Sequence, residues 1–443
     1  MTATDTIFEP LALGPLTVRN RILRSSVAGR FDNMDGSGTQ VRINWDVKFA
    51  RQGLGAIISS NAPVHARGGI VPGYAHIDTD ETIPFWRELG ERVHEHGCPY
   101  ILQIVHAGRE RILPFLQWEK ALSSSNKPEP VNGFPAQAMT IAEIHEVVEM
   151  FAAAARRAQE AGLDGIEVAG ANGMLPTQFL SSAINDRKDS YGGPLENRAR
   201  FGLEVVRAIR EAVGPDFCVG YKISIQERLN ELLPWLPKGN TLEESLQMCR
   251  WLEEAGADYL HVSAGGGFPH PRNPAGDFPT SQVVKTFDVL LSSGKYTFRN
   301  YVTFRTPPFN KAFGWWWTRP LRNREVEGIN LEDSRAVKGA VSIPVVCTGG
   351  FQTASVIARA IETGDCDGVT IARPLVANPD LVRHFEQGRD RAPRPCTYCN
   401  KCLFSFIEHP LACYEEARFD SHEDMIRAAM SVFEDATAPS EAG

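Results

Sequence analysis

Four segments of the chain repeat one local pattern, in which a helical stretch ends at a glycine and a short apolar run follows. Glycine is the residue that most readily ends a helix in the left-handed conformation. The apolar run lacks polar alternation, which is typical of a parallel strand buried on both faces. This pattern constrains the fold more than any other feature, and it occurs at residues 50–62, 158–171, 252–266 and 361–374.

Four further apolar runs end in polar or glycine residues, at residues 20–28, 99–108, 217–225 and 343–351. Helical patterns with apolar residues at i, i+3 and i+4 separate the runs, so the chain holds eight strand and helix units. Eight such units predict a (β/α)8 TIM barrel, for which more than about 400 residues occur with insertions. The alternative is an open doubly wound sheet, which is weakened because no GxGxxG turn follows the first strand.

Composition narrows the classes of function. The formal net charge of −8 and the pI near 5.8 argue against a nucleic-acid partner, because phosphate binding needs a basic excess. The N-terminus lacks a basic segment followed by an apolar one, and no run of about 18 apolar residues occurs. We therefore expect a cytoplasmic protein in a reducing compartment. Five of the nine cysteines stand singly in apolar runs, which predicts core packing and not disulfides.

The carboxyl ends of barrel strands carry the chemistry of this fold, and here they are rich in polar residues and glycine. The last two strands end in TGGF and IARPL, where glycines let backbone N–H groups approach an anion and an arginine can pair with it. Each polar residue alone also fits a plain strand-end hydrogen bond. Together they predict a phosphorylated cofactor or substrate, and the candidates are Ser25, Ser26, Asn61, Gln103, His106, Asn172, Lys222, Ser224, Gly265, Gly266, Gly267, Gly349, Gly350 and Arg373.

Motifs at these strand ends match the pattern of a known family. They are QIVHAGR (103–109), NGMLPTQFLSSAINDRKDSYGGPLENRARF (172–201), CTGGF (347–351) and ARPLVANPDL (372–381). From about residue 7 to about residue 415, the chain resembles the old yellow enzyme family of NADH:flavin oxidoreductases. The resemblance implies an FMN-dependent oxidoreductase whose barrel holds FMN at the strand ends.

The resemblance also implies a role for each matching position. Gln103 would hydrogen-bond the pyrimidine edge of the flavin, and Lys222, where the family usually has Arg, would lie near N1 and O2. A cation there stabilises the negative charge that an arriving hydride leaves on that side of the ring. The phosphate would be bound by Gly349, Gly350 and Arg373, and the flavin would be lined by Ser26 and Asn61.

The fourth strand departs from the family pattern of a His, then an Asn or second His, then a Tyr. Here these positions hold Ala169, Asn172 and Met174, so the clamp that polarises a substrate carbonyl is half present and the proton-donating Tyr is replaced. A subgroup that includes 2,4-dienoyl-CoA reductase and trimethylamine dehydrogenase is more similar. That resemblance makes His270, in AGGGFPHPR, the candidate acid, in a catalytic set with Asn172 and Lys222; a structural loop His is the alternative.

A cysteine-rich loop (396–415) follows the barrel (1–395) and precedes a predicted helix and polar tail (416–443). Its spacing, C-x2-C-x2-C-x10-C, resembles a ligand run for a [4Fe–4S] cluster, and the resembling subgroup uses it so. A zinc site and free thiols are the alternatives, although zinc sites usually separate two CxxC pairs more widely. The metal ligands would be Cys396, Cys399, Cys402 and Cys413.

An insertion after the sixth strand, about residues 280–328, has a different character from the rest of the chain. Residues 289–324 hold seven Lys or Arg, no acid and nine aromatic residues. They predict a lid over the flavin, a peripheral membrane contact, or a docking site for an acidic electron-transfer protein; an insertion packed on its own barrel is the alternative. A lid of this composition would suit a CoA thioester or another large, apolar and anionic substrate.

These patterns favour an FMN-dependent oxidoreductase that reduces an activated C=C bond of the enoate or dienoyl type by hydride transfer from flavin N5. NAD(P)H or a separate redox partner protein would supply the electrons. One alternative is an oxidative dehydrogenase of an amine or alicyclic substrate, and another is an electron-transfer flavoprotein without turnover of a small molecule. A flavin-free barrel aldolase would need a Schiff-base lysine at a strand end, where Lys222 is the sole candidate.

Overall fold

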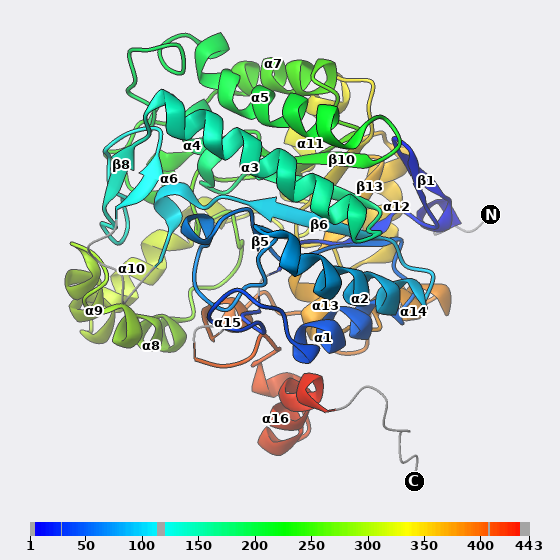
Figure 1. The fold of residues 1–443 in the computed structure, drawn as a ribbon. Helices are drawn as coiled ribbons and strands as arrows, with labels where there is room; N and C mark the ends of the chain where they lie inside the picture. Colours follow the sequence, from blue (N-terminus) through cyan, green and yellow to red (C-terminus); the bar gives the residue numbers. More distant parts are fainter. Residues whose placement is uncertain (1–4, 28, 113–119, 406–407, 435–443) are drawn as a thin grey trace.

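A computed structural model describes residues 5–27, 29–112, 120–405 and 408–434. Eight parallel strands form a closed ring, because β13 pairs with β3 and β4 pairs with β6 (Figure 1). All eight expected strands and the predicted (β/α)8 barrel are confirmed. The strands are β3 (Ile22–Arg24), β4 (Ala56–Ile58), β6 (Tyr100–Val105), β9 (Gly165–Gly170), β10 (Cys218–Ser224), β11 (Tyr259–Ser263), β12 (Val345–Thr348) and β13 (Gly368–Ile371).

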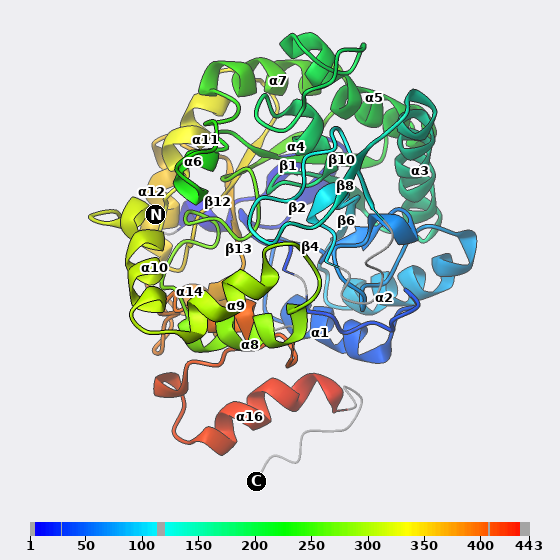
Figure 2. The same cartoon turned by 90° about the vertical axis from the view of Figure 1, so that its left-hand side faces the viewer.

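Helices surround this barrel (Figure 2). Two of the longest begin with reciprocal capping boxes, in Thr140 with Glu143 and in Thr241 with Glu244, which satisfy the first free N–H groups of each helix. The inner faces of these helices are apolar and pack on the strands. The outer layer comprises α1 (Gln40–Ala50), α2 (Ile83–His94), α3 (Ile141–Glu160), α5 (Leu195–Val213), α7 (Leu242–Glu254), α11 (Leu331–Lys338), α12 (Ala354–Glu362) and α14 (Leu381–Glu386).

An antiparallel hairpin, β1 (Leu11–Leu13) and β2 (Leu16–Val18), fills the amino end of the barrel. Leu11, Leu13 and Val18 are buried and pack against apolar side chains from inside the ring, including those of Leu23, Ile58 and Ile101. In Figure 1 this hairpin lies on the opposite side of the molecule from α8, α9 and α10. The carboxyl end of the strands is therefore the end at which a site can form.

The expected insertion after β11 forms three helices, α8 (Thr280–Leu290), α9 (Thr297–Arg305) and α10 (Phe309–Trp317). Figure 2 shows them as one group at the rim of the barrel. Other loops at the rim carry α4 (Leu175–Leu180), α6 (Leu229–Leu232), α13 (Arg373–Ala377) and the short strand pair β7 (Ala121–Ser123) and β8 (Ala136–Ala138).

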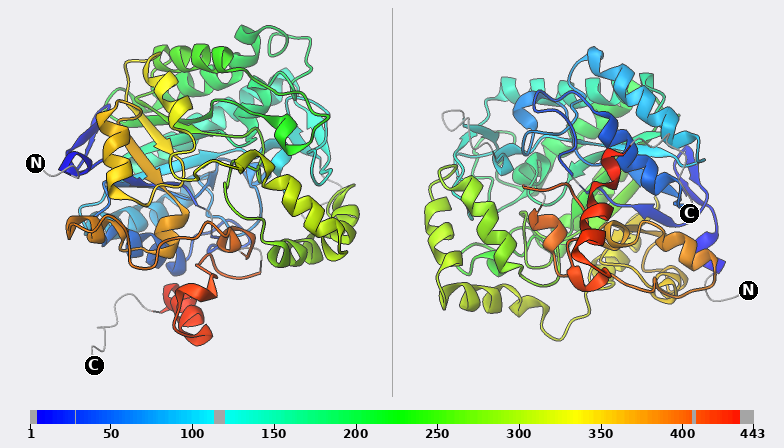
Figure 3. Two further views of the ribbon diagram at one scale, coloured as in Figure 1. Left: turned by 180° about the vertical axis from the view of Figure 1, so that it is seen from behind. Right: turned by 90° about the horizontal axis from the view of Figure 1, so that it is seen from below.

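The segment after the barrel holds α15 (Lys401–Ser405) and α16 (His422–Met430). The short turn after α16 (Ser431–Phe433) contacts α1, where Asn44 Nδ2 donates to the carbonyl oxygen of Val432 at 3.1 Å, and Figure 3 shows α16 on this side of the molecule. The tail expected after residue 434 lies outside the described residues, as do residues 406 and 407 of the cysteine loop. Among the residues described, the model contains no helix with the length and apolar character needed to cross a membrane.

Candidate functional site

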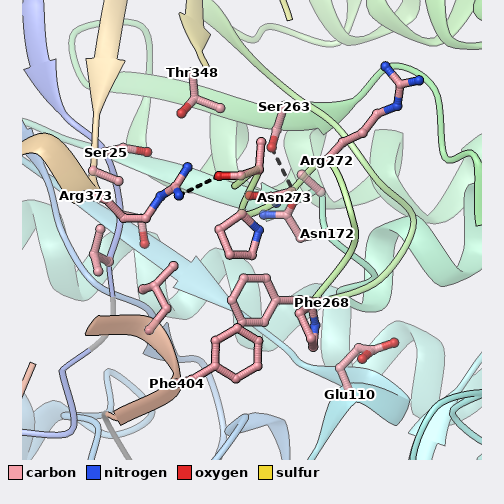
Figure 4. A pocket seen from close by; sticks show the side chains of 18 of the residues that line it. Ser25, Glu110, Asn172, Ser263, Phe268, Arg272, Asn273, Thr348, Arg373 and Phe404 are labelled. Atoms are coloured by element: carbon pink, nitrogen blue, oxygen red, sulfur yellow. Dashed lines mark hydrogen bonds between the residues drawn. The ribbon is translucent and has the colours of Figure 1, made fainter. Parts of the chain in front are cut away.

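A cavity of about 280 Å³ opens at the carboxyl ends of the strands (Figure 4). It gathers residues that are far apart in the sequence, and every cofactor-binding candidate lines it. These are Ser26, Asn61, Gln103, Lys222, Gly349, Gly350 and Arg373, together with the catalytic candidate Asn172.

A buried carboxylate organises the polar residues inside the barrel beneath this cavity. Glu167 accepts hydrogen bonds from Gln103 Nε2 at 2.6 Å and from Tyr259 Oη at 3.0 Å, and His261 Nδ1 lies 2.9 Å from it. Burial alone would raise the pKa of Glu167, but its interactions with His261 and Lys222 keep that pKa below the usual range. Burial lowers the pKa of Lys222, and the charge of Glu167 opposes that shift.

This arrangement fits the pyrimidine end of a flavin. Because Glu167 holds the Nε2 group of Gln103, the Oε1 atom of that amide remains an acceptor for a ring N–H group. Lys222 is 6% exposed and lines the cavity, so it can place a cation beside a ring that becomes negative on reduction. Sequence reasoning missed Glu167, although an acid inside the apolar run GIEVAG was a visible signal.

The glycines after β12 and Arg373 after β13 form the opposite end of the site. Arg373 NH1 donates to the carbonyl oxygen of Ala275 at 2.6 Å and to Asn400 Oδ1 at 2.5 Å, which leaves the rest of the guanidinium to pair with a phosphate. Gly350 has φ 73°, and a Cβ there would lie 3.0 Å from the carbonyl oxygen of Val326. The Tyr398 hydroxyl donates to the carbonyl oxygen of Gly350. The cysteine loop thus contacts both parts of the candidate phosphate site, Arg373 through Asn400 and Gly350 through Tyr398.

Asn172 presents an amide donor to the cavity. Its Oδ1 atom accepts from Ser263 Oγ at 3.1 Å and from Asn273 Nδ2 at 2.7 Å (Figure 4). Because both donors hold the oxygen, the Nδ2 group of Asn172 is the part that can bind a substrate carbonyl. Ala169 and Met174 also line the cavity, so two positions where the family pattern has polar residues are apolar here.

His270 does not line the cavity. Its Nδ1 accepts from the backbone N–H of Arg272 at 3.2 Å, and its Nε2 lies 3.1 Å from the carbonyl oxygen of Arg228. Burial lowers its pKa to about 4, so the ring is neutral at physiological pH. The backbones of His270 and Asn273 also exchange two hydrogen bonds. His270 therefore holds Arg272 and Asn273 in position, whereas the expected catalytic acid would line the cavity.

Glu110 lines the cavity and was missed in the sequence, where it follows the HAGR motif directly. A Cβ atom built on Gly173 would lie 2.9 Å from Glu110 Oε1, so the carboxyl group lies beside the loop that holds Asn172 and Met174. Burial, with help from Glu129, raises the pKa of Glu110 well above its usual range, and Arg109 opposes the shift. Burial also raises the pKa of Glu129, while backbone hydrogen bonds at 2.7 Å and 2.6 Å oppose that shift. Burial thus favours the protonated form at both carboxyls, and Glu110 is the one that lines the cavity.

The insertion supplies an apolar wall to the same cavity. Phe278, just before α8, has its ring centroid 5.1 Å from that of Phe313 and 5.6 Å from that of Phe304. The inner faces of α8, α9 and α10 thus cover one side of the site, as a lid would. The wall consists of Phe278, Val283, Phe287, Leu290, Phe304, Phe313, Trp317 and Phe404.

The four clustered cysteines line a second, much smaller cavity of about 10 Å³, on the far side of Arg373. Arg418 NH1 donates to Cys413 Sγ at 2.9 Å, and burial raises the pKa of the other three thiols. No group of three or more His, Cys, Asp or Glu in the described residues has the geometry of a metal site. The residue types nonetheless fit an iron–sulfur cluster, because four soft ligands and a cation that can bond sulfur line one small pocket.

Comparisons with known proteins agree with this geometry. A model of the NADH:flavin oxidoreductase / NADH oxidase family matches residues 6–273, and one of the dihydrouridine synthases matches residues 318–440. The chain is 32% identical over 401 residues to an NADH oxidase from Thermoanaerobacter brockii, which covers 90% of this chain and 54% of that relative. It is 30% identical over 404 residues to a 4,4'-dithiodibutanoate disulfide reductase from Rhodococcus erythropolis. That alignment covers 90% of this chain and 93% of the reductase.

The fold also matches solved structures. A complex of 2-naphthoyl-CoA reductase with 2-naphthoyl-CoA has a TM-score of 0.74 at 23% identity, over 93% of this chain and 56% of that one. Morphinone reductase in complex with tetrahydroNAD has a TM-score of 0.63 at 24% identity, over 89% and 93%. The chain spans about half the length of the NADH oxidase and nearly all of the disulfide reductase. The chain belongs to the NADH:flavin oxidoreductase / NADH oxidase family.

Proposed function

We propose that the protein reduces a C=C bond conjugated to a carbonyl group, in a substrate that carries a large apolar group. The observation that supports this proposal is that one apolar cavity is lined both by an amide donor, at Asn172, and by a buried carboxyl with a raised pKa, at Glu110. FMN, when bound, supplies hydride from N5 of its reduced ring. Gln103 and Lys222 would hold its pyrimidine end, and Arg373 with the two glycines would hold its phosphate.

The protein side chains prepare the alkene for hydride and complete the reaction with a proton. The Nδ2 group of Asn172 hydrogen-bonds the carbonyl oxygen and withdraws electron density, so that the β carbon accepts hydride. The Glu110 carboxyl donates its proton to the α carbon, in the role that Met174 cannot fill. The resulting carboxylate is unfavourable in this buried position and takes up a proton from solvent. The aromatic wall holds the apolar group and excludes water.

The charges of the cavity favour reduction of an alkene over oxidation of an amine. Glu110 is the one carboxyl among the described residues that line it, and burial favours its protonated form. With Lys222 and Arg373 facing FMN, the ammonium group of a substrate would therefore find no ionised carboxylate on this lining. Arg272, the third cation, is held by Glu231 at 2.7 Å and 2.8 Å and is neutralised there. The cavity suits the apolar acyl or aryl part of a substrate, including that of a CoA thioester.

We also propose a [4Fe–4S] cluster, which would supply one-electron transfer next to the flavin site. Its ligands would be Cys396, Cys399, Cys402 and Cys413, which line one small pocket. Arg418 donates to Cys413 Sγ and would offset part of the negative charge of the thiolates. A redox partner protein would then deliver electrons, and NAD(P)H is the alternative donor.

The test mixes anaerobically reduced holoenzyme with an aryl enone, with cyclohexenone and with cinnamoyl-CoA, and follows flavin reoxidation. We expect the aryl substrates to reoxidise the flavin faster than cyclohexenone, because only they reach the aromatic wall. In Glu110→Gln, we expect the rate to fall on the order of a hundred-fold, the usual size of general-acid catalysis.

The matched control is Glu227→Gln. Glu227 is also a buried carboxyl with a raised pKa, but it does not line the cavity. Wild-type rates in Glu110→Gln would remove that residue from the mechanism. If no alkene reoxidises the flavin but an amine reduces it, the oxidative alternative holds. If neither reacts, the protein is an electron-transfer flavoprotein.

A further inference from the structure

The three insertion helices carry large apolar side chains on their outer side as well as on the wall of the cavity. Phe298, Phe309 and Trp315 are 64%, 60% and 59% exposed. Val289, Leu291 and Val302 are exposed in the same segment. Six of the large apolar side chains that the described chain exposes thus lie between residues 289 and 315. Soluble monomeric proteins seldom expose so many large apolar side chains in one segment, so we expect this surface to be an interaction site.

The spacing separates an inner and an outer face on two of these helices. In α9, Phe298, Val302 and Arg305 are exposed at four- and three-residue intervals, whereas Phe304 is buried in the cavity wall. In α10, Trp315 is exposed and Trp317 is buried in that wall. A helix with apolar residues on both faces is normally covered on both. The barrel covers the inner face and leaves the outer one open.

Cations are interleaved with these apolar side chains. The residues from 289 to 324 hold seven Lys or Arg and no acid, in a chain of net charge −8. The guanidinium carbon of Arg322 lies 4.3 Å from the ring centroid of Trp315, and that of Arg305 lies 4.7 Å from the ring centroid of Tyr301. Asp288, just before this stretch, pairs with Arg305 at 2.7 Å. Aromatic rings and cationic groups therefore lie side by side on this surface.

We propose that the outer face of α8, α9 and α10 binds the surface of an anionic membrane. Rings would enter the boundary between headgroups and acyl chains, while Lys and Arg heads would pair with lipid phosphates. An acidic protein partner would meet the same cations, and the experiment below includes it as an outcome. The inner faces of the same helices wall the active-site cavity, so an apolar substrate could enter from the bilayer. Binding itself does not depend on the proposed reaction.

The experiment is co-sedimentation of the holoenzyme with phosphatidylcholine vesicles, with and without phosphatidylglycerol. We expect binding only to the anionic vesicles, and weaker binding as salt is raised. The Phe298→Ser/Trp315→Ser double variant is expected to lose binding and to keep its FMN content and its turnover of a water-soluble enone. Lys311→Gln and Arg319→Gln are each expected to weaken binding by about five-fold, the usual contribution of one basic residue near such a surface.

The matched control is Ile426→Ser/Met430→Ser, which removes two apolar side chains that are 42% and 44% exposed on α16. Wild-type vesicle binding in this control, with loss in Phe298→Ser/Trp315→Ser, supports the proposal. Equal binding to neutral and anionic vesicles, or equal loss in both double variants, overturns it. An enzyme that ignores vesicles overturns it too, and retention of that enzyme on an immobilised acidic ferredoxin would assign the surface to a protein partner.

Discussion

Replacing Asn400 with glycine tests whether the cysteine loop holds the flavin phosphate site. Asn400 lies between two of the clustered cysteines, and its Oδ1 accepts from Arg373 NH1 at 2.5 Å. Its backbone is left-handed, with φ 61°, and glycine adopts this conformation without strain. The Asn400→Gly change therefore removes the side chain and spares the backbone.

The change removes one charge-assisted hydrogen bond to Arg373, and with it the bonds from Asn400 Nδ2 to the carbonyl oxygens of Pro274 at 3.2 Å and Asp277 at 2.9 Å. Only the bond to Arg373 bears directly on the phosphate. Such a bond contributes about 1.5 kcal/mol or more, and Arg373 keeps its second anchor, the carbonyl oxygen of Ala275 at 2.6 Å. Because ~1.4 kcal/mol is tenfold in affinity, we expect the Kd for FMN to rise about ten-fold. Riboflavin has no phosphate, so its Kd is expected to stay unchanged.

The assay is a fluorescence titration of the deflavinated protein with FMN and with riboflavin, with iron measured on each preparation. Asn323→Gly is the matched control, since Asn323 also has φ 61° but is exposed in the insertion. An unchanged Kd for FMN in Asn400→Gly would refute the reasoning. Equal weakening of FMN and riboflavin would do the same, because it would mean a general loosening of the site.

Three further outcomes are expected. Lys222→Met should lower the two-electron potential of bound FMN by about 30 mV or more, since ~1.4 kcal/mol of anion stabilisation corresponds to that shift. A dye-equilibration titration measures this potential. An unchanged potential would contradict a cation beside the flavin ring. Cys402→Ser should reduce bound iron and bleach the broad visible absorption beneath the flavin bands, whereas zinc in place of iron in the wild type would make the loop a structural staple. Burial raises the pKa of Glu227 to about 7 from 4.5, so the folded state binds the extra proton between these values and the free energy of unfolding should fall by about 3 kcal/mol as pH rises from 4.5 to 7; denaturant titrations of Glu227→Gln should show a flatter profile over that range.

The barrel could be predicted because its signals are local. The glycines that end the repeated helical stretches, Gly53, Gly162, Gly256 and Gly364, all have positive φ in the structure, as a left-handed cap requires. The apolar strand runs are continuous because both faces of each strand are buried. Each of these features involves a few neighbouring residues, so the sequence alone displays them.

The site was harder to predict because its contacts join distant strands. The side chains of Gln103 and Glu167 meet across 64 residues, and those of Glu167 and His261 across 94. The sequence around each of these residues does not indicate which side chains of the neighbouring strands point into the barrel at the same height. His270 does not line the cavity for a similar reason, since the turn at residues 270–273 places its Nε2 atom 3.1 Å from the carbonyl oxygen of Arg228, a residue 42 positions earlier in the chain.

The hairpin that plugs the amino end of the barrel has a kinetic consequence. Leu11, Leu13 and Val18 fill the space through which a second entrance would run. The electron donor and the electron acceptor would then both reach the flavin through the cavity at the carboxyl ends of the strands, and they would bind there one after the other. Steady-state plots at several fixed concentrations of a small-molecule donor should therefore be parallel lines, the pattern of a ping-pong mechanism. Excess donor should inhibit by competing with the acceptor for the reduced enzyme.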